Sequence, residues 1–174
     1  MGGGGELHAG EIDFLVSRLL NGVLWLEVFA RDELPELSRE IRPWCLILNT
    51  DPKDKPGTHW LAFYAPIAGG IELFDSFGLS PRIYSLDILD PLHVSFSLQS
   101  PSSSVYGHYC IVYIYLRFRN SSLSDIFNLL IKISSQYLLV KQYIHNLQIC
   151  DRILNPCYCT GQRCKFKCQY CLTN

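Results

Sequence analysis

Apolar residues recur at helical spacing near the start of the chain. Segment 11–20 carries the apolar face of a predicted amphipathic helix, at Ile12, Leu15, Leu19 and Leu20. Asn21-Gly22 follows, and both residue types favour the end of a helix. Segment 23–37 has no clear period, and Pro35 breaks any long element in it. We therefore predict a short helix followed by an irregular segment.

Shorter apolar segments in the middle of the chain predict β-strands. Residues 44–48 form a continuous apolar run with the length of a buried strand, and a turn rich in Pro, Asp and Gly follows at 51–57. Segments 59–66 and 70–78 have the composition of two strands joined by a glycine-containing turn, which predicts a hairpin. Residues 92–99 alternate in part and predict a further strand, which a serine-rich polar loop follows.

The second half of the chain predicts helices. The long apolar segment 108–120 is interpreted as a central buried helix that begins near Gly107. Segment 122–134 begins with the N-cap candidate Ser122, and its apolar face is formed by Ile126, Leu129, Leu130 and Ile133. Segment 135–149 predicts another helix. The order of helix, strands and then helices predicts the α+β class.

Composition narrows the class of protein without defining it. The 174 residues are 48% apolar and 18% charged, which is typical of a globular domain. The net charge of −1 favours neither DNA nor an anionic membrane as a partner, so membrane binding is not expected and nucleic-acid binding stays open. Neither a secretion signal nor a membrane-spanning run is evident, so we expect an intracellular protein, cytoplasmic or nuclear.

The cysteines divide the chain into regions. Residues 1–10 have the composition of a flexible leader, residues 11–150 of one domain, and residues 151–174 of an unstructured cysteine-rich tail. A reducing compartment disfavours disulfides. Closely spaced thiolates can bind zinc, and the tail candidates are Cys157, Cys159, Cys164, Cys168 and Cys171. They lack a partner histidine, so we favour a tail without metal and expect no cofactor.

Four polar or aromatic residues stand at positions that suit nucleophilic catalysis. Alone, each has an ordinary structural explanation, such as packing for His59 or capping for Asp75. Together, the hairpin can bring His59 and Asp75 side by side, and a carboxylate fixes the tautomer of a histidine. The amide of Gln99 can donate to a developing oxyanion. Tyr106 stands at the start of the central helix, where a thiol would have a lowered pKa.

These residues carry a resemblance to a protease family. The chain contains "HWLAF", "LFDSFG" and "QSPSSSVYGHYC" in this order. It resembles the adenovirus-type cysteine endopeptidases, including those of virus-like DNA transposons, and more distantly the ubiquitin-like-protein-specific proteases. The resemblance runs from about Leu15 to about Asn128. It implies a papain-like superfamily fold, in which a small mixed sheet packs against a central buried helix and flanking helices.

The resemblance also implies a role for each residue. His59 corresponds to the general base, Asp75 to the residue that orients it, and Gln99 to the oxyanion-hole glutamine. The substrate-binding positions of the family match Trp60 and Gly107. The nucleophile position falls on Tyr106. The substrate would be a peptide or protein, and activation by DNA or a viral-type peptide, as in the family, stays open.

Tyrosine at position 106 predicts little or no peptidase activity. A phenol has a pKa of about 10 against about 8.5 for a thiol, and its oxygen is the poorer acyl acceptor. Cys110 lies about 6 Å further along the helix axis and is expected to be a buried core thiol. The alternative function is a non-catalytic module that holds a peptide or a ubiquitin-like tail. An unrelated α+β fold is the third alternative.

Overall fold

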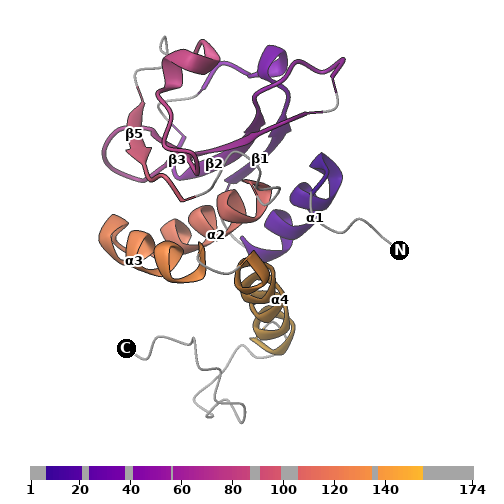
Figure 1. The fold of residues 1–174 in the computed structure, drawn as a ribbon, viewed down its shortest axis with the longest axis vertical. Coiled ribbons are helices and arrows are strands. Elements are labelled where there is room, and N and C mark those ends of the chain that lie inside the picture. The colour runs from indigo at the N-terminus through magenta and orange to yellow at the C-terminus, as the bar shows by residue number, and fades with distance from the viewer. Residues whose placement is uncertain are drawn as a thin grey trace.

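The computed structural model describes residues 7–20, 24–37, 41–55, 57–86, 91–98, 106–134 and 137–154. Among these residues, a sheet lies on one side of the molecule and the four α-helices lie on the other (Figure 1). The elements in chain order are α1 (Ala9–Leu19), β1 (Leu24–Phe29), the 3₁₀ helix η1 (Arg31–Glu33), β2 (Trp44–Asn49), β3 (Trp60–Ala65), β4 (Glu72–Asp75), the 3₁₀ helix η2 (Pro81–Tyr84), β5 (Leu92–Ser95), α2 (Tyr106–Phe118), α3 (Leu123–Ser134) and α4 (Tyr137–Leu154).

The sheet is mixed and its strands follow chain order, β1-β2-β3-β4-β5. The outer pairs β1–β2 and β4–β5 are parallel, whereas β2–β3 and β3–β4 are antiparallel. The predicted hairpin is therefore confirmed as β3–β4, in which Ala62 pairs with Phe74. The α+β class is confirmed as well, with a mixed sheet of five strands.

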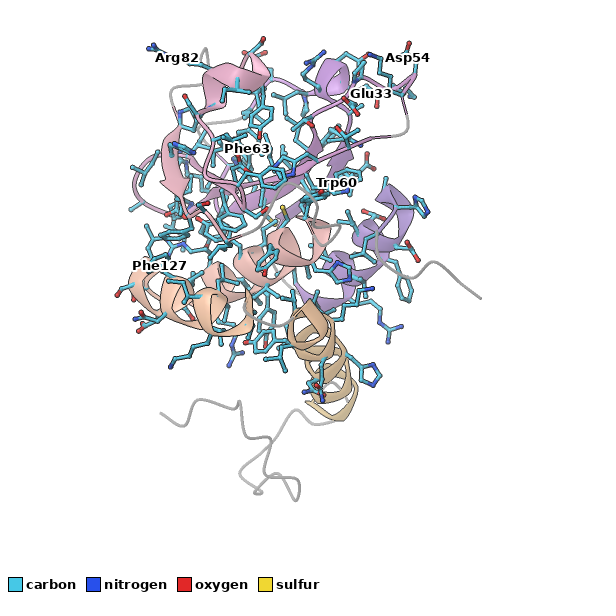
Figure 2. All side chains as sticks on the ribbon, in the orientation of Figure 1. Glu33, Asp54, Trp60, Phe63, Arg82 and Phe127 are labelled. Carbon is cyan, nitrogen blue, oxygen red and sulfur yellow. The ribbon has the colours of Figure 1, made fainter. Side chains whose placement is uncertain are left out.

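Alternation along the strands divides the core between the two faces of the sheet. Toward the helices, Ala62 and Phe74 pack in one cluster with residues of α1 and α2. Toward the other face, Leu61 and Phe63 pack in a second cluster, which the segments around η1 and η2 cover. Figure 2 shows Trp60 and Phe63 on opposite sides of β3.

The expected central helix is confirmed as α2, which packs directly beneath the sheet (Figure 1). Its residues from Gly107 to Ile114 are all buried. The ring of Tyr113 stacks on Phe74 of β4 at 4.4 Å between centroids. Ser122 accepts a hydrogen bond from the backbone N–H of Asp125, which confirms the predicted cap of α3.

A buried ion pair joins β4 to the last turn of α2. Glu72 is 4% exposed and accepts hydrogen bonds from Nε and Nη2 of Arg117, at 2.8 and 2.7 Å. The hydroxyl of Tyr113 donates to the same carboxylate at 2.7 Å. Arg117 also lies over the ring of Tyr64 at 5.4 Å. The first residue of β4 is therefore fixed to the end of α2.

Several predicted boundaries were wrong. Residues 24–29, expected to be irregular, form strand β1, because pairing with β2 supplies their hydrogen bonds and α1 packs next to them. The strand predicted at 92–99 ends at Ser95. Helix α1 begins at Ala9, inside the expected leader, and α4 continues to Leu154, past the expected start of the tail.

Some predictions fall on residues outside the described ranges. These are the first six residues of the leader, the helix end at Asn21-Gly22, the serine-rich loop, and the tail after Leu154. Within the described ranges, no helix combines the length and the apolar character that crossing a membrane requires.

Candidate active site

His59 and Asp75 meet at the end of the β3–β4 hairpin. Asp75 is the last residue of β4 and His59 immediately precedes β3. Ala62 pairs with Phe74, and extending this register by one residue brings Asp75 level with Leu61, so His59, two residues before Leu61, lies diagonally across on the same face. His59 Nε2 lies 2.7 Å from Asp75 Oδ1, and the side chains are 6% and 0% exposed. The predicted juxtaposition is confirmed, whereas the catalytic roles stay a prediction.

The carboxylate of Asp75 accepts four hydrogen bonds. Oδ1 accepts from His59 and from the N–H of Phe77, and Oδ2 accepts from the N–H of Leu79 and the hydroxyl of Tyr84. Burial by itself raises the pKa of Asp75, but the hydrogen bond and charge of His59 and the hydrogen bonds from Phe77 and Tyr84 outweigh burial and lower it. The carboxylate therefore stays ionised near neutral pH.

The imidazole of His59 lies inside a shell of aromatic rings. It stacks on Phe77 at 4.4 Å and on Tyr84 at 5.9 Å between centroids, and Tyr106 meets it edge-on at 5.0 Å. Nε2 faces Asp75, while Nδ1 is buried without a hydrogen-bond partner among the described atoms. A carboxylate partner holds the proton on Nε2, which leaves the lone pair of Nδ1 as the basic position.

Tyr106 lies at the position that the sequence pattern assigns to the nucleophile. It is the first residue of α2 and is half-buried. Its ring meets His59 at an interplanar angle of 81° and lies 5.2 Å from the ring of Phe77. An aromatic ring thus fills the space between the start of α2 and the imidazole.

Cys110 does not replace the missing thiol. It is fully buried, and its Sγ lies 3.3 Å from the carbonyl oxygen of Trp60. Burial, together with the charge of Asp75, raises the pKa of this thiol well above its usual range. Burial raises the pKa of Cys45 in the same way. The expectation of a buried core thiol is confirmed, because neither sulfur can act as a thiolate at neutral pH.

A cleft of about 310 Å³ opens beside Trp60. Its walls come from the start of α1, the end of β1 and the 49–57 turn, and they include Leu7, His8, Val28, Phe29, Lys53 and Trp60. Trp60 itself is only 4% exposed and belongs to the core. It lies between the sheet and the helices (Figure 2).

Gly107 serves helix packing. A Cβ at this position would lie 2.9 Å from Cδ1 of Ile12, so the missing side chain allows α1 to approach α2. Its expected contact with substrate stays a prediction. The other expected residues cannot be placed, because Gln99 and the five tail cysteines lie outside the described residues. Within the described part, no group of three His, Cys, Asp or Glu residues could hold a metal ion.

Two further residues, Phe77 and Tyr84, belong to this site although no sequence pattern pointed to them. Phe77 stands inside the quoted "FDSFG" segment, yet its stacking on His59 follows only from the turn that Asp75 begins. Tyr84 lies nine residues after Asp75 in a 3₁₀ helix, and no spacing in the sequence indicates that its hydroxyl returns to the carboxylate.

No family model and no curated protein matches this sequence.

Proposed function

We propose that this chain is a papain-like, adenovirus-type cysteine endopeptidase whose peptidase activity is lost at the nucleophile position. The observation that supports this best is the buried His59–Asp75 pair beside the first residue of α2, in which Nδ1 of His59 has no hydrogen-bond partner among the described residues. In such a peptidase, that nitrogen would take the proton of a thiol at the helix start.

Tyr106 interrupts this chemistry in two ways. A phenol stays protonated at neutral pH and is a poor acyl acceptor. Its ring also occupies the space beside His59, where attack would need the substrate carbonyl within about 3–3.5 Å of the nucleophile. The proposed protein is thus related to the proteases of viruses or virus-like transposons. It keeps the general base, His59, and has lost the nucleophile at position 106.

The test compares peptide hydrolysis by the wild-type chain with that by Tyr106→Cys. The proposal predicts no turnover by the wild type and thiol-reagent-sensitive turnover by Tyr106→Cys. Tyr106→Ala is the matched control, because it removes the ring without supplying a thiol. Equal, thiol-sensitive turnover by the wild type and Tyr106→Cys contradicts the loss at position 106. No turnover by a folded Tyr106→Cys contradicts the peptidase assignment.

The cleft beside Trp60 supports a second function, the binding of a peptide or a ubiquitin-like tail without cleavage. Its volume of about 310 Å³ lies at the lower end of the range for small-ligand sites, and its walls combine apolar side chains such as Val28 and Phe29 with polar and charged ones such as Glu33 and Lys53. Titration with a panel of peptides and ubiquitin-like tails, followed by calorimetry, tests this function. We expect Trp60→Phe to weaken binding, while Trp44→Phe, buried on the opposite face of the sheet, leaves it unchanged.

A further inference from the structure

We infer that Tyr84 is a positioning residue, whose hydroxyl fixes the carboxylate of Asp75 and thereby the orientation of His59. This inference concerns the same site as the proposed function. Only its consequence for catalysis rests on the proposed function. The contacts that carry it do not depend on which chemistry the site performs.

Tyr84 reaches both members of the pair at once. Its hydroxyl lies 3.0 Å from Oδ2 of Asp75, and its ring stacks on the imidazole of His59 at an interplanar angle of 29°. It is the last residue of η2, and it packs against the core cluster on the face of the sheet away from the helices. The side chain is therefore anchored in the core while its tip faces the carboxylate.

The two oxygens of Asp75 receive different kinds of donor. The N–H groups of Phe77 and Leu79 belong to the turn that Asp75 itself begins, so they move with it. Tyr84 is the only side-chain donor besides His59 in the part of the chain that the structure describes. Without its hydroxyl, Oδ2 keeps a single donor, and rotation about the Cβ–Cγ bond of Asp75 is less restricted. The angle at which Oδ1 meets Nε2 then becomes less defined.

The charged and titratable groups around Asp75 indicate that the Tyr84 hydroxyl acts only as a hydrogen-bond donor to this carboxylate. Among the described residues, the titratable groups that interact with the carboxylate are His59, Tyr84 and the buried thiol of Cys110. Burial, and then the charge of Asp75, raise the pKa of Tyr84, so the hydroxyl keeps its proton and remains a donor. The hydrogen bond from Tyr84 is among the interactions that lower the pKa of Asp75.

The test uses NMR of the purified full chain with labelled histidine and aspartate, and it needs no substrate. In Tyr84→Phe, we expect the Nε2–H proton signal of His59 to move upfield and to exchange faster with water. We also expect the midpoint of the Asp75 carboxyl titration to move to higher pH. Tyr64→Phe, which removes the hydroxyl of a buried tyrosine in β3, leaves both signals unchanged. A folded Tyr84→Phe with both signals as in the wild type overturns the inference.

A tyrosine analogue that keeps the hydroxyl makes the inference testable even if Tyr84→Phe does not fold. Site-specific 3-fluorotyrosine at position 84 preserves the hydroxyl and makes it a stronger donor. We expect the Asp75 midpoint to move to lower pH, and an unchanged midpoint overturns the inference. These results are independent of the proposed function. If Tyr106→Cys is inactive but the His59 signal changes in Tyr84→Phe, only the peptidase assignment is refuted. If Tyr106→Cys is active but the His59 signal does not change in Tyr84→Phe, only this inference is refuted.

Discussion

Replacement of Glu72 by glutamine tests whether β4 is fixed to α2 by the buried ion pair. Glu72 begins β4 and Arg117 lies in the last turn of α2, whereas Asp75 ends β4 and Tyr106 begins α2. Strand and helix therefore run in opposite directions, with the ion pair at one end and the candidate site at the other. Glu72→Gln keeps the shape of the side chain and removes its charge, which leaves Arg117 without its counter-ion.

The expected cost follows from burial. The side chains of Glu72 and Arg117 are 6% and 17% exposed, and three hydrogen bonds converge on the carboxylate. Removing one partner of a buried pair costs about 3–5 kcal/mol. We expect the lower end, about 3 kcal/mol, because Arg117 keeps some contact with water and the amide oxygen can still accept. This is a large share of the roughly 5–15 kcal/mol that stabilises a domain.

Urea unfolding followed by circular dichroism measures the effect. Glu33→Gln is the matched control, because Glu33 forms an ion pair with Lys53 in which the side chains are 38% and 74% exposed. Exposed pairs contribute about 0–1 kcal/mol, so the control should remain close to the wild type. A Glu72→Gln variant that loses less than about 1 kcal/mol would refute the reasoning, since Glu72 would then behave as a surface residue.

Three further predictions concern two kinds of buried group and one glycine with a positive φ. Burial is the main reason that the pKa of His108 is lowered to about 4, so the wild type should lose up to about 3 kcal/mol as pH falls from about 6.5 to 4. In His108→Gln, the free energy of unfolding, measured in urea, should fall less steeply over this pH range. An equally steep fall contradicts the account. Gly57→Ala should cost about 1–3 kcal/mol in the same assay, because φ is +84° and a Cβ would lie 1.9 Å from Nδ2 of Asn49; an unchanged midpoint contradicts this. Alkylation mapped by mass spectrometry should leave Cys45 and Cys110 unmodified until urea is added, and their modification in the native protein contradicts their burial.

The strands and helices that the sequence predicts well are those with a local signal. Residues 44–48 are continuously apolar because β2 is covered on both faces, and the glycine-containing turn after β3 marks the hairpin. The cap at Ser122 is likewise a local hydrogen bond. Strand β1 lacks such a signal, because its pairing partner lies about twenty residues later and Glu27 on its exposed side interrupts the apolar pattern. Parallel pairing of this kind leaves no turn in the sequence to indicate it.

In the candidate site, too, one part was predictable from the sequence and another part was not. The approach of His59 to Asp75 follows from hairpin geometry and was predictable. The shell around them was not, because Tyr84 comes from a 3₁₀ helix whose path depends on packing against the far face of the sheet. Arg117 shows the same limit. A cation near the end of a helix is common, and no spacing in the sequence indicates that its guanidinium makes a bidentate contact with Glu72.

The most direct test of the central claim is the reactivity of a thiol introduced by Tyr106→Cys. Alkylation at position 106 is measured against pH, alone and combined with His59→Ala, with the modified site located by mass spectrometry. We predict rapid alkylation well below pH 8.5 for Tyr106→Cys and its loss in the double variant, because His59 and the start of α2 stabilise a thiolate there. An ordinary thiol profile with a midpoint of about 8.5 in both variants would contradict the account.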